Sequence, residues 1–343
     1  MATTLELGLC TFGDVSAGPD GRPLSHAQVI RNLIEEAVLA DELNIDCFGA
    51  GEHHRSEFAV SSPEVVLAAI AGRTRRIRLG SAVTVLSTDD PVRVFQRFST
   101  LHAAANGRTE VILGRGAFTE SFPLFGYDLA QYGELFEEKL DLFAALLRRE
   151  RVTWRGRTRS ALTDQRVFPT IEAGVLRTWV AVGSTPESVL RAARHELPLM
   201  LGIIGGEPER FRAFVEIYRR AFDKLGRPLQ AIGAHSPGYV ADTDARARDE
   251  YWSAYQPMRD QLGRERGWSP ITRAKFDLEV DRGSLYVGSP ATVAGRIAAT
   301  IKDLGLSRFD IKYSTGALAH EKLMRSVELF GREVIPQVRA CLA

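Results

Sequence analysis

The stretch IDCFGAGEHH, residues 45–54, decides the fold. Its short apolar run ends in two glycines, a carboxylate and two imidazoles, so titratable groups lie where a predicted strand leaves the core. A helix is predicted to start at Ser62-Pro63-Glu64, because proline suits the first helical turn. In α/β proteins, ligands bind at the carboxyl ends of the strands. The stretch therefore predicts one β-strand/α-helix unit with a binding site at its end.

The same order of strand and helix recurs along the chain. Alternating units imply a parallel sheet, and eight of them favour a closed (β/α)8 TIM barrel over an open doubly wound sheet. The first predicted strand-to-helix turn also lacks the GxGxxG pattern of dinucleotide-binding folds. The strands are expected at 5–12, 46–49, 77–85, 110–113, 178–182, 197–204, 230–240 and 309–313, and the helices at 25–44, 63–72, 91–105, 131–149, 186–195, 208–225, 292–304 and 323–334.

No break in composition divides this pattern, so we expect a single domain over residues 1–343. The polar stretches 151–176 and about 241–290 are longer than ordinary connections. We interpret both as insertions at the C-terminal mouth of the barrel.

The bulk composition narrows the class of protein. The 343 residues carry 44 Lys and Arg against 43 Asp and Glu, so no strong field favours nucleic acid or an anionic membrane. The three cysteines are scattered without CxxC spacing, which points to neither a disulfide framework nor a zinc site. No basic leader or membrane-length apolar run is present, so we expect a cytoplasmic protein.

Glu52, His53 and His54 admit three interpretations: a metal site, a structural pair, or a histidine that faces a substrate or cofactor. Adjacent residues of an extended segment point in opposite directions, so at most one imidazole should face into the barrel. No HxH or HxxxH partner is present elsewhere, and the third interpretation is favoured.

Two glycine-containing turns are candidates for ligand contacts. Gly114-Arg115-Gly116 lets the backbone approach a ligand while the guanidinium offers bidentate donors, although a surface ion pair is the plain alternative. Residues 183–188, Gly-Ser-Thr-Pro-Glu-Ser, begin a predicted helix whose N–H groups attract an anion, although helix capping alone explains Ser184 and Thr185. Similar turns at 288–292 and 314–316 remain rivals for a phosphate.

Taken together, these segments resemble the bacterial luciferase-like monooxygenases, a family of flavin-dependent (β/α)8 barrels. The matching segments occur in family order and cover most of the chain: EHHRSEF at 52–58, RLGSAVTVLSTDDPVRVFQ at 78–96, NGRTEVILGRGAF at 106–118, WVAVGSTPES at 179–188 and FDIKYSTGALAHEKLMRSVELFGREVIP at 309–336.

The resemblance implies a role for each of several residues. His53 would lie near the reactive edge of the flavin, and Arg115 would contact the flavin and its phosphate side. Gly183, Ser184 and Ser188 would bind the phosphate. Ala82 and Val83 fall where the family carries a non-prolyl cis peptide against the flavin ring. Gly114 and Gly183 replace a cysteine and an acidic residue of the light-emitting member, which argues against light emission.

The predicted function is that of a flavin-dependent monooxygenase that uses reduced FMN and O2 to oxidise a small organic substrate. A separate flavin reductase or NAD(P)H would supply the reduced cofactor, and the family tendency implies a homodimer through the helices at 63–73 and 91–105. The alternatives are a coenzyme F420-dependent dehydrogenase or reductase, a metal-dependent barrel hydrolase with Glu52, His53 and His54 as ligands, and a non-enzymatic flavin-binding protein.

Overall fold

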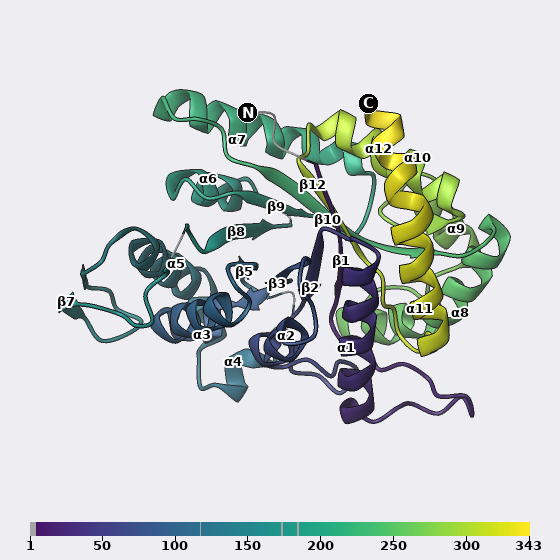
Figure 1. Cartoon of the computed structure of the whole chain (residues 1–343), viewed down its shortest axis with the longest axis horizontal. Helices are drawn as coiled ribbons and strands as arrows, with labels where there is room; N and C mark the ends of the chain where they lie inside the picture. The colour runs from purple at the N-terminus through teal and green to yellow at the C-terminus, as the bar shows by residue number, and fades with distance from the viewer. Residues whose placement is uncertain (1–4, 117, 173, 184) are drawn as a thin grey trace.

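The computed structural model describes residues 5–116, 118–172, 174–183 and 185–343. Within them, eight parallel strands close into a barrel (Figure 1), which confirms the predicted fold class. The ring closes because β1 pairs with both β2 and β12, while β9 pairs with β8 and β10. Around the barrel the strands are β1 (Glu6–Thr11), β2 (Cys47–Ala50), β3 (Arg78–Ser81), β5 (Thr109–Gly114), β8 (Arg177–Val182), β9 (Leu199–Gly202), β10 (Ile232–Val240) and β12 (Arg308–Lys312).

Helices surround the barrel, as the alternation predicted. Four of them begin with proline at the first turn, where the missing N–H costs no hydrogen bond. The main helices are α1 (His26–Glu42), α2 (Pro63–Ala71), α3 (Pro91–Ala104), α5 (Tyr132–Arg148), α6 (Pro186–Arg194), α7 (Arg212–Leu225) and α10 (Pro290–Leu304). The last helical segment is longer than predicted and consists of α11 (His320–Leu329), a π-helical turn (Phe330–Val334) and α12 (Ile335–Leu342).

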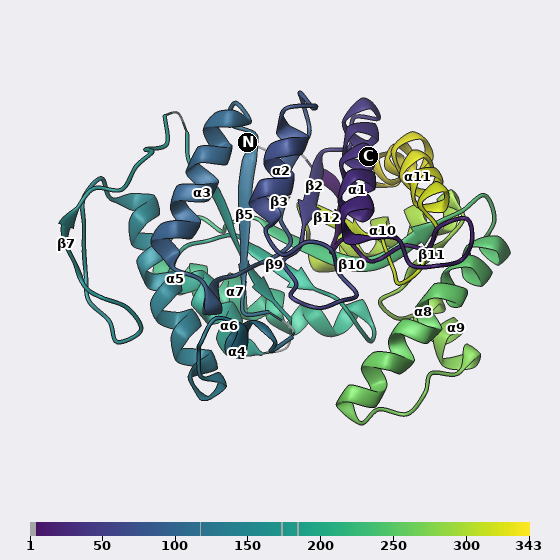
Figure 2. The same ribbon diagram turned by 90° about the horizontal axis from the view of Figure 1, so that it is seen from below.

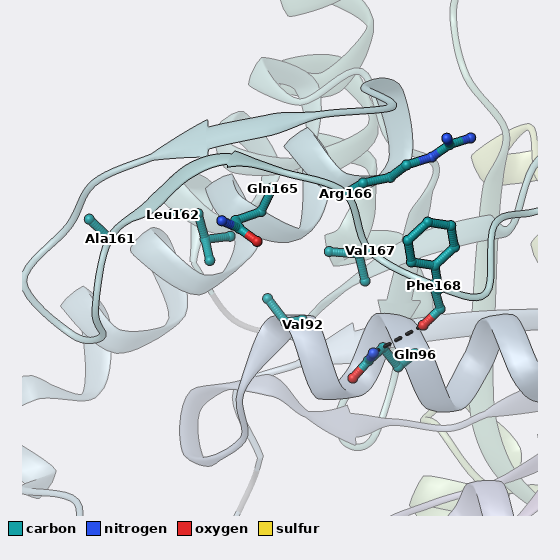
Figure 3. Close-up of a pocket in the computed structure, with 8 residues that line it drawn as sticks. All are labelled: Val92, Gln96, Ala161, Leu162, Gln165, Arg166, Val167 and Phe168. Atoms are coloured by element: carbon teal, nitrogen blue, oxygen red, sulfur yellow. Dashed lines mark hydrogen bonds between the residues drawn. The ribbon is translucent and has the colours of Figure 1, made fainter.

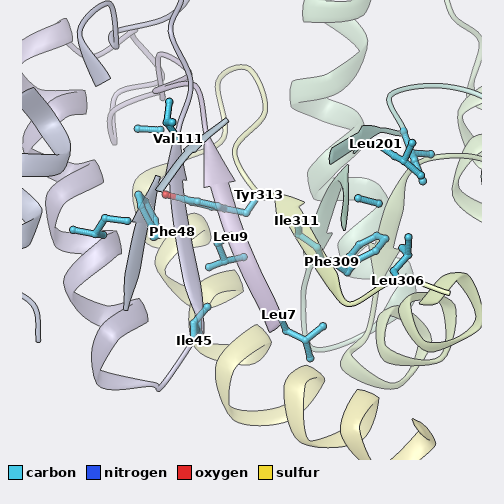
Figure 4. Close-up of a cluster of buried hydrophobic side chains, with 14 of the residues drawn as sticks. Leu7, Leu9, Ile45, Phe48, Val111, Leu201, Leu306, Phe309, Ile311 and Tyr313 are labelled. Carbon is cyan, nitrogen blue, oxygen red and sulfur yellow. The ribbon is translucent and has the colours of Figure 1, made fainter. Parts of the chain in front are cut away.

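The main hydrophobic core lies between the strands and this layer of helices. Leu9, Phe48 and Tyr313 come from neighbouring strands or their ends and are at most 1% exposed (Figure 4). The rings of Phe48 and Tyr313 lie 6.1 Å apart. Alternate residues of each strand face this core, so the residues between them face the barrel interior.

Buried charges fill part of the barrel interior. Arg308 donates to Asp310 at 2.8–3.0 Å and also to Glu110, whose second oxygen accepts from the Trp179 indole at 3.1 Å. Burial raises the pKa of Asp310 to about 6, although the neighbouring Arg308 opposes that shift. Gly8 leaves the space for this network, because a Cβ there would collide with Asp310 Oδ1.

The predicted strand at 77–85 is interrupted. β3 stops at Ser81, the Ala82–Val83 peptide bond is cis, and the short β4 (Thr84–Val85) pairs with β5. Backbone hydrogen bonds hold the interruption against the segment after β2: Ala82 N donates to Ala50 O at 2.8 Å, and Glu52 N donates to Val83 O at 3.0 Å. The cis peptide implied by the resemblance is present.

The two long connections contain regular elements. Residues 151–176 include an antiparallel hairpin of β6 (Val152–Trp154) and β7 (Leu162–Gln165). Residues 241–290 contain α8 (Asp244–Arg266), α9 (Arg273–Asp281) and β11 (Tyr286–Gly288), which pairs with β10. Figure 2 shows the hairpin and the α8–α9 pair projecting from opposite sides of the molecule.

The remaining short helices connect strands to the main helices. They are α4 (Ser121–Leu124) and four-residue or shorter 3-10 turns at Leu86–Thr88, Leu129–Gln131 and Pro208–Phe211. In the part of the chain that the structure describes, no helix is both long and apolar enough to cross a membrane.

Candidate active site

His53 lies in an aromatic cluster at the mouth of the barrel. Its ring centroid is 4.4 Å from that of Phe12, 4.5 Å from Phe58 and 5.3 Å from Phe118. Burial lowers the pKa of His53 to about 3, although the carboxylate of Asp14 opposes the shift. The imidazole is therefore neutral at pH 7. A neutral imidazole still offers one hydrogen-bond donor and one acceptor.

The two histidines have different ring neighbours: His54 lies 5.0 Å from Phe125 rather than in the aromatic cluster around His53. Both residues line one small cavity at the mouth, together with Ser121. The segment between them is held on two sides, because Glu52 N bonds to Val83 O and His53 N bonds to Val60 O. Ser121 Oγ is buried and has no hydrogen-bond partner among the described residues.

Glu52 connects His54 to the segment after the cis peptide. One carboxylate oxygen accepts from His54 Nε2 at 2.9 Å, and the other accepts from Val85 N at 2.8 Å. Both oxygens are thus engaged by protein donors, and the side chain is only 9% exposed. No three His, Cys, Asp or Glu residues are grouped as metal ligands anywhere in the described ranges. The observed role of Glu52 is to orient His54 and this part of the backbone.

Lys312 and Asp14 form a buried ion pair beside the aromatic cluster, and neither was singled out from the sequence. Lys312 Nζ donates to Asp14 Oδ1 at 2.7 Å and lies 4.7 Å from the centre of the Phe12 ring. Asp14 also accepts from Ser314 Oγ at 2.5 Å and from Gly316 N at 3.3 Å. A protein carboxylate therefore occupies the turn at 314–316, which was one rival for the phosphate.

The turn at 288–292, the other rival site for the phosphate, also binds a protein carboxylate. Asp244 accepts from Ser289 N at 2.6 Å and from Thr292 Oγ1 at 3.0 Å. The hydrogen bonds hold the pKa of this carboxyl below its usual value, although burial opposes them. The carboxylate of Asp244 thus already occupies the N-terminus of α10.

Three side chains converge on Ser188 at the turn before α6. Ser188 Oγ lies 3.2 Å from Arg115 Nη2, 3.4 Å from Arg191 Nη1 and 2.8 Å from Thr185 Oγ1. Arg191 pairs with Glu137, but Arg115 has no carboxylate partner among the described residues. We call Arg115, Thr185, Ser188 and Arg191 the anion turn, because two guanidinium groups and a helix N-terminus meet there. Ser184 lies outside the described residues.

The structure brings three of the predicted residues together here. Arg115, directly after β5, meets Ser188 in α6, and Gly183 directly follows the neighbouring β8. Arg115 also lies 5.1 Å from the ring centre of Tyr132. Thr185 is the N-cap residue, but its hydroxyl bonds to Ser188 rather than to a backbone N–H. The first N–H groups of α6 thus have no side-chain cap among the described residues.

Five residues at or near the carboxyl ends of barrel strands are partly or fully exposed, and we call them the open floor. They are Val83, Ala181, Gly183, Ile204 and His235. Val83 and Ala181 pack on a small interior cluster of Ile112, Trp179 and Met200. A Cβ at Gly183 would meet no atom within 4 Å, and Ile204 is 64% exposed.

A further cavity lies away from the mouth, between the hairpin and α3 (Figure 3). It has a volume of about 320 Å³ and is lined by Val92, Gln96, Ala161, Leu162 and residues 165–168. Gln96 Nε2 donates to the carbonyl of Phe168 at 3.0 Å. None of the predicted site residues lines it.

Comparison with known proteins identifies the family. Residues 5–308 match the luciferase-like monooxygenase family, and the chain belongs to that family. It is 27% identical to the 4-hydroxyprotoasukamycin monooxygenase of Streptomyces nodosus subsp. asukaensis, over 90% of this chain and 87% of the relative. It is 26% identical to an alkanal monooxygenase alpha chain of Photorhabdus luminescens, over 64% and 60% of the two chains.

Solved structures share the fold over almost their whole length. A monooxygenase from Streptomyces bottropensis superposes with a TM-score of 0.82 at 25% identity, covering 97% of this chain and 99% of that one. The oxygenating component of 3,6-diketocamphane monooxygenase from Pseudomonas putida, in complex with FMN, gives 0.77 at 20% identity over 98% and 99%. An F420-dependent secondary alcohol dehydrogenase gives 0.74 at 14% identity over 98% and 99%. The chain is thus an oxidoreductase by family.

Proposed function

We propose that the protein is a flavin-dependent monooxygenase that uses reduced FMN and O2 to oxidise a small organic substrate. The observation that carries the proposal is the convergence of Arg115 and Arg191 on Ser188 at the N-terminus of α6. Arg115 has no carboxylate partner among the described residues, and Arg191 shares Glu137 with Arg194, so a bound anion such as the FMN phosphate is favoured there. The open floor beside them suits the flavin ring.

The residues of the mouth take distinct roles in this proposal. Arg115, Gly183, Ser184 and Ser188 bind the phosphate side, while Ala82 and Val83 support the ring. His53 faces the reacting end as a neutral imidazole, held by Phe12 and Phe58. The bound flavin supplies the redox chemistry, and the protein supplies orientation and a dry pocket.

An F420-dependent dehydrogenase or reductase is the second candidate. One structural neighbour binds coenzyme F420, which is also a flat flavin-like ring with a phosphate-bearing side chain. The anion turn and the open floor suit either cofactor. The absence of a grouped ligand set in the described ranges gives the metal-dependent hydrolase no support.

A titration of the purified protein with FMN and with F420, followed by visible absorbance, tests the proposal. We expect saturable binding of FMN with a shifted flavin spectrum, and activity that survives a chelator. Binding of F420 with no binding of FMN would establish the second candidate. Binding of neither, or loss of activity on chelation with stoichiometric metal in the sample, would reject the proposal.

We also propose a cytoplasmic homodimer of one domain per chain, served by a separate flavin reductase or by NAD(P)H directly. The helices expected at the interface are α2 and α3, and the apolar side chain of Val65 in α2 is 66% exposed. Val65→Glu should convert the dimer to a monomer in light scattering. A monomeric parent protein would refute the proposed assembly.

A further inference from the structure

We propose that His235 of β10 is a second ligand-contacting imidazole, which hydrogen-bonds the ring system of the bound cofactor from the floor of the mouth. The inference rests on the proposed flavin function and adds a residue that the sequence patterns did not mark. It is carried by the position of His235, by its exposure, and by the absence of a partner for its ring nitrogens.

His235 lies at the level where the barrel opens. It pairs in register with Gly202, the last residue of β9, and with Asp310 of β12. Its ring is directed across Gly202, since a Cβ on Gly202 would come within 3.2 Å of His235 Nε2. Glycine at 202 therefore makes room for the imidazole inside the barrel.

The side chain is accessible where its neighbours are not. Ala234 and Ser236 on the same strand are fully buried, whereas His235 is partly exposed. Val83 and Ala181, which support the same open floor, are partly exposed as well. Because its ring lies against Gly202 within the barrel, the accessible surface of His235 belongs to the mouth rather than to the outside of the barrel.

Neither ring nitrogen of His235 has a hydrogen-bond partner among the described residues, which is uncommon for a polar group inside a fold. Burial lowers the pKa of His235 to about 4, and the charges of Arg308 and Lys312 add to the effect. The imidazole is therefore neutral and keeps one donor and one acceptor for a ligand. Flavin and deazaflavin rings carry carbonyl and N–H groups along one edge, which match that pair.

His235 and His53 flank the ion pair described above. His235 lies on β10, and His53 lies on the segment after β2. Two strands run between them: β12, which carries Lys312, and β1, which is followed by Phe12. Lys312 contributes to the lowered pKa of both histidines. His53 thus lies on one side of the ion pair, within the aromatic cluster, and His235 lies on the other side, as part of the open floor.

The experiment compares FMN and riboflavin binding in three proteins: the parent, His235→Phe and Ser188→Ala. His235→Phe keeps a ring of similar shape without nitrogen atoms, and His235→Gln restores a donor and an acceptor. We expect His235→Phe to weaken both ligands by about 3- to 10-fold, the worth of one neutral hydrogen bond. His235→Gln should recover part of that loss. Ser188→Ala should weaken FMN and leave riboflavin unchanged.

A second measurement observes the ring nitrogens of the parent protein directly. In protein labelled with 15N-histidine, the ring nitrogens of His235 should shift on addition of FMN, with the assignment made from His235→Gln. Unchanged binding in His235→Phe together with unshifted nitrogens would overturn the inference while the flavin proposal stands. A parent protein that binds neither FMN, riboflavin nor F420 would overturn both.

Discussion

The guanidinium of Arg115 lies 3.2 Å from the hydroxyl of Ser188, although 73 residues separate them in the chain. This contact joins the end of β5 to the first turn of α6 across β8. It places a cation without a described carboxylate partner at a helix N-terminus, which is the electrostatic environment that an anion requires.

Replacing Ser188 by alanine should weaken FMN binding by about 1–3 kcal/mol, the range for hydrogen bonds to charged groups. Arg115→Lys should also weaken it, because an ammonium cannot reproduce the planar bidentate donor. Isothermal titration with FMN measures both effects. Arg22→Lys, at a side chain that is 86% exposed, is the control. Full FMN affinity in both site variants would place the phosphate elsewhere.

His53 should make the protein sensitive to acid. Its folded pKa of about 3 lies below the unfolded value of about 6.5, so its contribution to stability is fully present above pH 6.5 and is lost as the pH falls toward 3. The free energy of unfolding should fall by up to about 1.4 kcal/mol per pH unit in that window because of this group. His53→Phe should remove that part of the slope in urea titrations at pH 5.0 and 7.5.

The exposed His26 provides the matched control. His26→Asn should retain the steep loss of stability below pH 6.5 that His53→Phe loses. Parallel curves for the parent and His53→Phe would show that the imidazole of His53 is as easily protonated in the folded protein as in the unfolded chain.

The strands and helices could be predicted because each depends on a local pattern. Proline at the start of four helices and the apolar stripe Phe136, Leu140, Phe143 and Leu147 are signals within one segment. Arg115 and Ser188 could be marked for the same reason, since each follows a strand in a turn of small residues. Their role in binding FMN stays a prediction.

Contacts between distant segments could not be predicted in this way. The Asp14–Lys312 pair joins residues 298 positions apart, and nothing near Asp14 in the sequence marks it as the anion of the 314–316 turn. The position of His54 depends on backbone hydrogen bonds that Glu52 and His53 make to Val83 and Val60, and on its own hydrogen bond to Glu52.

Gly8 should be intolerant of any side chain. A Cβ there would lie 2.9 Å from the Cβ of Cys47 and would also collide with Asp310 Oδ1, which Arg308 holds in place. Gly8→Ala should therefore lower the free energy of unfolding by about 1–3 kcal/mol, the usual cost of overpacking.

Gly295→Ala is the control, since that glycine is exposed within α10 and a Cβ meets nothing within 4 Å. It should raise stability by about 0.5–1 kcal/mol. Equal effects from the two substitutions would contradict the proposed steric cause.

Arg55 joins three segments over the mouth and should control how readily they open. Its side chain is only 13% exposed, and it contacts Glu57 at 3.0 Å, Glu265 at 2.6 Å and Glu120. Its guanidinium also lies 4.8 Å from the ring centre of Phe118, which packs against His53. One cation therefore links the loop after β2, the α4 segment and the end of α8.

Arg55→Gln removes the charge while it keeps most of the side chain, so the three carboxylates lose their shared partner. Hydrogen exchange should become faster in residues 53–58, in residues 118–124 and at the end of α8, with local opening easier by about 1–3 kcal/mol. Exchange in α10 should not change, because no contact of Arg55 reaches it. Arg22→Gln serves as the exposed control. Unaltered exchange at 118–124 in Arg55→Gln would mean that Phe118 is held by its other neighbours, the rings of His53 and Phe58 and the guanidinium of Arg266. The mouth would then open independently of the ion pairs of Arg55.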